Sequence, residues 1–131
     1  MSINVKWIDK CHFKATTKDG FSVDIDADNR VAPCPTEALL YALGACSATD
    51  VVLLLQEKGA ELQSLENNVT HTLTEGEPRL YQSANLHFVV KGKGFTESDV
   101  LAAAEEAISK HCHVCLMLQP QIDIRCTVEI I

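Results

Sequence analysis

Apolar and polar residues alternate along the first 26 positions in the manner of antiparallel strands. Asp19 and Gly20 form a favourable pair for a hairpin turn between two of these strands. The strands are predicted over the runs INVKWI, CHFKATT and FSVDID. The polar stretch ADNRVAPCP follows and separates this strand-rich segment from a long apolar run.

That apolar run predicts one long helix. Pro33 and Pro35 exclude a helix before about residue 35 and favour a helix start there. We expect the helix to extend to Lys58, with Gly59 as its C-cap. Because the helix is apolar on nearly every face, it has to be covered on several sides. One small sheet cannot cover it all, so we expect a homodimer in which two such helices pack together.

The second half of the chain predicts two long paired strands, a helix and a final strand. Alternation returns at Leu62, turns at GEPR and continues to about residue 94. Thr96 is predicted to open a helix that ends near KHCHVC, and Pro120 excludes a simple continuation. Its apolar residues recur at helical spacing: Val100, Leu101, Ala104, Ala107 and Ile108.

The predicted order is therefore β-β-β-α-β-β-α-β, with IDIRCTVEII as the last strand. This order is that of an α+β fold. A length of 131 residues allows one domain with a real core, so a single domain over residues 1–131 is expected.

The net charge and the composition limit which binding partners and which cellular compartment are expected. The formal net charge of -7, with scattered lysines, argues against nucleic acid as a partner. The N-terminus lacks the pattern of a secretory signal, and no apolar run is expected to approach the roughly 20 residues that span a bilayer. We therefore expect a cytoplasmic chain without membrane contact. In that compartment the six cysteines stay reduced, which leaves catalysis, metal binding or core packing as their roles.

Cys46 and Asp50 are four residues apart on the predicted central helix, so they share one face. A cysteine among Leu, Ala and Val is often no more than a small apolar side chain. An ionised carboxylate is seldom buried without a partner, so Asp50 either fixes the position of the helix or serves the thiol. Both interpretations stay open for each residue.

The segment HCHVC holds a second pair of thiols, Cys112 and Cys115. A Cys-x-x-Cys pair indicates redox chemistry or half of a zinc site. No second such pair completes a zinc set, so neither a metal nor another cofactor is expected. Cys112 is predicted to end a helix without a helix N-terminus to lower its pKa, which suits a resolving thiol. His111 and His113 are candidates to lower the pKa of a neighbouring thiol.

Several of these residues together resemble the OsmC/Ohr family, the osmotically inducible and organic hydroperoxide resistance proteins. The resemblance rests on Pro35 and Glu37 at the helix start, the segments ALGACSATDVV and CHVCLML, and the strand order. It spans essentially the whole chain. The chain looks closest to the shorter OsmC-like branch, whose pattern Gly-x-Cys-x-x-x-Asp matches Gly44, Cys46 and Asp50.

The resemblance implies an intertwined homodimer with the two central helices at its core. It also implies a thiol peroxidase of the oxidative stress response that reduces organic hydroperoxides by peroxiredoxin-type chemistry and is recycled by a dithiol such as dihydrolipoamide. By motif, Cys46 matches the peroxidatic cysteine and Cys112 the resolving cysteine, with Cys115 second in line. In such an enzyme the first thiolate becomes a sulfenic acid, which the second thiol converts to a disulfide.

The sequence departs from the family pattern where a charge should activate the thiol. The peroxidase branches use an arginine from the N-terminal strands, held by a glutamate directly after the proline. Here Thr36 occupies that position, Glu37 comes one residue later, and the first arginine is Arg30. Two alternatives therefore stay open: a small-molecule binding protein on the same fold, and a thiol redox or metal-responsive protein, each without efficient peroxidase turnover.

Overall fold

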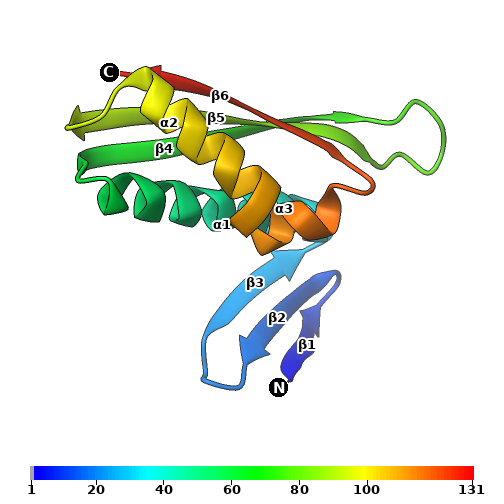
Figure 1. Cartoon of the computed structure of the whole chain (residues 1–131). Helices are drawn as coiled ribbons and strands as arrows, with labels where there is room; N and C mark the ends of the chain where they lie inside the picture. The colour runs from blue at the N-terminus through cyan, green and yellow to red at the C-terminus, as the bar shows by residue number, and fades with distance from the viewer. Residues whose placement is uncertain (1) are drawn as a thin grey trace. The chain divides into compact units, whose positions relative to one another are not determined.

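The structure, a computed structural model, describes residues 2–131 and confirms the α+β prediction: those residues form two three-stranded sheets and one long helix (Figure 1). The elements are β1 Ile3–Asp9, β2 His12–Thr17, β3 Ser22–Asp26, α1 Pro35–Glu57, β4 Glu61–Leu73, β5 Tyr81–Lys93, α2 Glu97–Glu106, the π-helix η1 Ala107–His111, α3 His113–Leu118 and β6 Asp123–Ile130. The chain divides into two compact units, residues 1–41 and 42–131, and the single domain stays a prediction.

The first unit is an antiparallel meander in the order β1-β2-β3. Its β2–β3 turn lies at the predicted pair, where Gly20 has φ +90° and its N–H donates to the Thr17 carbonyl at 3.0 Å. The buried Asp26 carboxylate orders the loop that follows, since it accepts from the Asp28 and Val31 N–H groups at 2.9 and 3.2 Å. These bonds fix the chain just before α1 begins.

Helix α1 begins at Pro35, as predicted, and ends at Glu57, with Gly59 at φ +90° after it. The expectation that no apolar run approaches the length of a membrane span is wrong for this helix. The helix has 23 residues, and its most apolar 18-residue window has a mean hydropathy of 1.9, so by length and composition it could cross a membrane. The core helix of a soluble protein passes the same test. Only 28% of its most apolar window is buried within one chain, and Leu39, Tyr41 and Leu53 are exposed.

The second sheet has the order β4-β5-β6 and supplies most of the core. Strands β4 and β5 pair antiparallel, as predicted, whereas β6 pairs parallel to β5. A parallel pair needs a crossover connection, which the segment from α2 to α3 provides. Alternate residues of β5 are completely buried: Leu86, Phe88 and Val90. Leu43, Val51 and Leu55 of α1 and Val100 of α2 belong to the same buried set.

The second predicted helix is divided into three pieces. Thr96 caps α2 as predicted, in a capping box with Asp99. The chain then widens into the π-helix Ala107–His111, leaves helical geometry at Cys112 with φ -70° and ψ 106°, and resumes as α3. The predicted order therefore lacked two short elements. The interruption matters because it lies at one of the candidate cysteines.

Candidate thiol site

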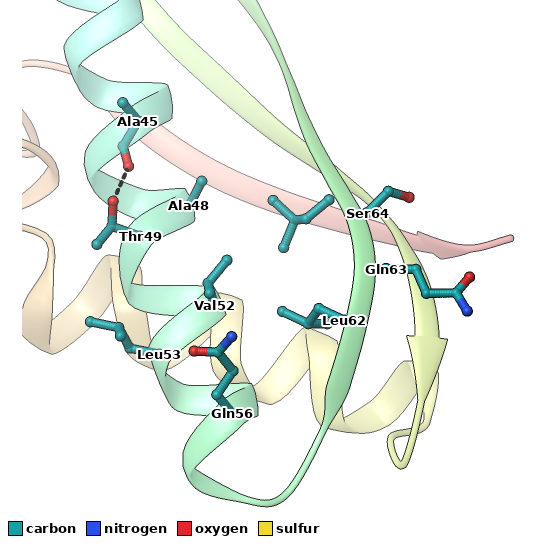
Figure 2. A pocket seen from close by; sticks show the side chains of 10 residues that line it. Ala45, Ala48, Thr49, Val52, Leu53, Gln56, Leu62, Gln63 and Ser64 are labelled. Carbon is teal, nitrogen blue, oxygen red and sulfur yellow. Dashed lines mark hydrogen bonds between the residues drawn. The ribbon is translucent and has the colours of Figure 1, made fainter.

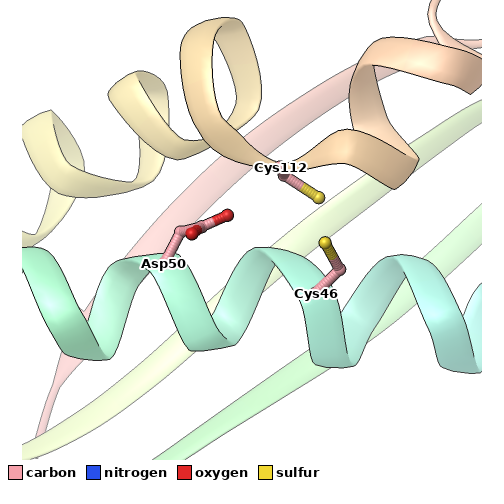
Figure 3. Close-up of side chains that lie close together, drawn as sticks. All are labelled: Cys46, Asp50 and Cys112. Atoms are coloured by element: carbon pink, nitrogen blue, oxygen red, sulfur yellow. The ribbon is translucent and has the colours of Figure 1, made fainter.

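The structure brings Cys46, Asp50 and Cys112 together. Cys46 and Asp50 lie one turn apart on α1, and Cys112 lies at the junction of η1 and α3 (Figure 3). Their two sulfur atoms and a carboxylate oxygen all lie within 4.8 Å of one another. Cys112 is completely buried, whereas Cys46 and Asp50 on α1 are half-buried. All three residues belong to the second unit.

The interruption of the helix determines where the Cys112 side chain lies. Its N–H donates to the Ala107 carbonyl at 2.7 Å, which closes the π-helix. Its sulfur accepts a hydrogen bond from the Cys115 N–H at 3.3 Å and so caps α3. The prediction that Cys112 only ends a helix is therefore wrong, because it also begins the next one. The spacing of apolar residues in the sequence does not reveal that the helix is interrupted at Cys112.

Burial nevertheless keeps the Cys112 thiol protonated. Burial is the largest influence and raises the pKa of Cys112; the hydrogen bonds from Cys115 act in the opposite direction, and the nearby Cys46 thiol raises the pKa further. Cys115 is also completely buried, and burial together with Cys112, Cys46 and Asp50 raises the pKa of its thiol strongly. A protonated thiol is a poor nucleophile toward a peroxide, so neither residue is suited to the first attack.

Two residues that the sequence analysis did not select hold the Cys46 segment against β4. The Asn67 Nδ2 donates to the Gly44 carbonyl at 3.0 Å and to Ser47 Oγ at 3.2 Å. Ser47 Oγ is buried and donates to the Leu43 carbonyl at 2.7 Å. Gly44 favours this approach, since a Cβ there would lie 3.1 Å from the Val69 side chain, a tight contact. The sequence offered two signals for these roles: a serine, Ser47, within the apolar run of α1, and an asparagine, Asn67, within the alternating pattern of β4.

The other candidate residues lie outside the cluster. Glu37 accepts from the Asn29 side chain and from the Cys34 N–H, and so anchors the loop before α1 within the first unit. His111 is exposed and pairs with Glu106 at 2.9 Å. His113 is exposed on the first residue of α3. The pKa of both neighbouring thiols, Cys112 and Cys115, is raised rather than lowered.

Among the described residues, the carboxylate of Asp50 has no oppositely charged or hydrogen-bonding partner. Within residues 2–131 the structure records neither a hydrogen bond nor an ion pair for it. Arg30, the first arginine of the chain, pairs instead with Asp9 at 2.8 Å and approaches Asp26 at 4.0 Å within the first unit. Asp50 therefore lies beside the two thiols, and no basic side chain of the described chain is paired with it.

A groove of about 520 Å³ runs between α1 and the start of β4 (Figure 2). Its lining is mostly apolar, with Ala48, Val52, Leu53, Leu62 and Leu65 among the residues. The volume is that of a typical small-molecule site. Cys46 does not line this groove, because residues 45, 49 and 52 face a different side of α1 from residues 46 and 50.

Comparisons with known proteins agree with the architecture. The family model described as OsmC-like protein matches residues 26–127. Protein YhfA of Escherichia coli (strain K12) is 33% identical over 132 residues, covering 100% of this chain and 98% of that protein. An OsmC-like protein from Mycoplasma pneumoniae superimposes with a TM-score of 0.83 at 22% identity, covering 99% of this chain and 96% of that one. The organic hydroperoxide resistance protein OhrB of Bacillus subtilis gives a TM-score of 0.65 at 16% identity and 98% coverage of both chains.

Proposed function

The chain belongs to the OsmC-like protein family, and on this basis we propose that it is a thiol peroxidase that reduces organic hydroperoxides. Membership supports a redox or peroxide-related role. The observation that carries the specific proposal is the approach of Cys46 and Cys112, whose sulfurs lie within 4.8 Å although 65 residues separate them in sequence. Two thiols so close are suited to forming a disulfide across two elements.

The reaction assigns different tasks to the two thiols. The Cys46 thiolate attacks the distal oxygen of the hydroperoxide, the O–O bond breaks, and the alcohol leaves with a proton. Cys46 is then a sulfenic acid. Cys112 attacks its sulfur, an S–S bond forms, and the hydroxyl group leaves as water after taking the Cys112 proton. One hydroperoxide and two thiols thus give one alcohol, one water and one disulfide.

The exposure of the two residues fits this order. Cys46 is half-buried and accessible to a peroxide, whereas Cys112 is completely buried and protonated until a sulfenic acid forms beside it. The Asp50 carboxylate lies within 4.8 Å of both sulfurs, a separation that one water molecule can bridge for proton exchange. An external dithiol such as dihydrolipoamide would reduce the disulfide, and the cycle requires a reducing compartment such as the cytoplasm.

We further propose that the functional form is a homodimer. The exposed apolar residues of α1, Leu39, Tyr41 and Leu53, need a cover that the described chain does not supply. We expect light scattering of the reduced protein at micromolar concentration to give twice the 14.4 kDa chain mass. Replacing Leu53 with aspartate should shift the mass toward the monomer, whereas Asn68→Asp, at an exposed position of β4 that does not line the groove with Leu53, should not. A monomeric wild-type mass would contradict the proposal.

Oxidation kinetics test the peroxidase. The reduced protein, in buffer with a metal chelator, is mixed in a stopped-flow instrument with cumene hydroperoxide or with hydrogen peroxide. We expect rapid oxidation that favours the organic peroxide, followed by a Cys46–Cys112 disulfide in mass mapping. Oxidation as slow as that of an ordinary thiol outside the cluster, such as the half-buried Cys34, would contradict the proposal. The groove between α1 and β4 would then favour a small-molecule binding protein on the same fold.

A further inference from the structure

We propose that reduced Cys46, Asp50 and Cys112 bind one thiophilic divalent cation, with Zn²⁺ as its representative. This inference goes beyond the peroxidase and does not depend on it, because metal binding requires the same three side chains but no turnover. It also differs from the sequence-based expectation of no metal. That expectation started from Cys112 and Cys115, which only Cys34, His12, His71 or His87 could have completed through the fold, whereas the structure places Cys46 and Asp50 of α1 beside Cys112.

The distances within the cluster are close to those of a zinc site. The three donor atoms lie within 4.8 Å of one another. With Zn–S bonds of about 2.3 Å in tetrahedral geometry, two sulfur ligands lie roughly 3.8 Å apart. A contraction of about 1 Å is therefore sufficient. Figure 3 shows the three side chains already pointing toward one another, so rotation about their side-chain bonds can supply it.

The donor set selects the class of cation. Two thiolates and one carboxylate suit a borderline-soft ion such as Zn²⁺ much better than Mg²⁺ or Ca²⁺, which prefer oxygen ligands only. The Asp50 carboxylate has no other partner in residues 2–131. A bound cation would pair with the Asp50 carboxylate and displace the proton of the Cys112 thiol.

The surroundings of the cluster hold the ligands in place. The Cys115 N–H donates to the Cys112 sulfur at 3.3 Å, the kind of outer hydrogen bond that orients a metal ligand. Asn67 fixes the turn of α1 next to Cys46 through Gly44 and Ser47. Cys46 and Asp50 are half-buried, which leaves access for a fourth ligand such as water.

Metal binding and disulfide formation exclude each other, because both use the Cys46 and Cys112 sulfurs. Oxidation by a hydroperoxide should therefore release the ion, and the bound ion should slow oxidation of Cys46. The free concentration of the cation would in this way set how readily the thiols respond to peroxide.

Zinc and cobalt titrations test the proposal. The reduced protein is titrated anaerobically with Zn²⁺ against a chromogenic chelator, and with Co²⁺ to detect thiolate-to-metal charge-transfer absorption. We expect one equivalent per chain. Cys112→Ser should weaken affinity at least about 100-fold, and Asp50→Asn about 10-fold. Cys126→Ser, a half-buried cysteine of the same unit outside the cluster, should leave affinity unchanged.

The circular dichroism of each variant is compared with that of the wild type to check that it folds. If a cysteine variant does not fold, Asp50→Asn still tests the site, because it removes a ligand without replacing a cysteine. Absence of thiolate–cobalt absorption, or equal affinity in wild type and both Cys112→Ser and Asp50→Asn, would overturn the proposal. Because no peroxide is present, this failure is distinct from a failure of the peroxidase. A protein that binds zinc but oxidises slowly would retain the metal site and lose the proposed reaction.

Discussion

Replacing Cys46 with serine is expected to lower the rate of organic hydroperoxide reduction on the order of 10³-fold or more, because a serine hydroxyl does not ionise near neutral pH. Cys112→Ser should behave differently. The first oxidation of Cys46 should remain, but the sulfenic acid should persist and over-oxidise, since the buried thiol within 4.8 Å is gone. Single-turnover oxidation and multiple-turnover reduction, measured in parallel, separate the two effects.

Two further cysteines serve as controls in that comparison. Cys115→Ser should retain most of the activity, because the Cys115 sulfur lies outside the three-atom cluster. Cys126→Ser should also keep its activity, since Cys126 lies on β6 and is not part of the cluster of Cys46, Asp50 and Cys112. If Cys115→Ser and not Cys112→Ser accumulated sulfenic acid, Cys115 would be the resolving residue. If Cys46→Ser kept more than a tenth of the wild-type rate, another residue would be the peroxidatic one.

The sequence predicted the regular elements well because their physical causes are local. Pro35 fixes the start of α1, Thr96 caps α2, and Gly20 forms its turn, each through the chemistry of one residue. The division of the second helix has a different origin. Its π-helix and the break at Cys112 depend on burial and on a sulfur that accepts the Cys115 N–H. Neither cause is visible in apolar spacing.

The candidate site was predictable only in part for the same reason. Helical spacing alone places Cys46 and Asp50 on one face. The partnership with Cys112 came from a family resemblance and is consistent with the observed cluster. The roles of Asn67 and Ser47 could not be predicted, because a strand residue and a helix residue 20 positions apart are joined only by the fold. Likewise, the position of the Asp50 carboxylate next to the Cys112 thiol depends on how the fold packs two distant elements together.

The pairing of β4 with β5 contains a position that accepts only glycine. Gly92 of β5 pairs with Leu62 of β4, beside a register shift between Leu62 and Ser64. A Cβ at Gly92 would lie 2.2 Å from the Glu61 carbonyl oxygen and 3.0 Å from the Phe95 ring. The first contact is with backbone and cannot be relieved by turning a side chain. One of the two strands therefore has to move.

Gly92→Ala is accordingly expected to destabilise the protein by about 3 kcal/mol or more, because it displaces the strand that carries the buried residues Leu86, Phe88 and Val90. The free energy of unfolding is measured by urea titration of the reduced protein. Gly76→Ala is the matched control, since a Cβ there meets nothing within 4 Å. A loss at Gly92 no larger than at Gly76 would mean that β4 and β5 can separate locally at little cost. The close approach at Glu61 would then contribute nothing to holding the sheet together.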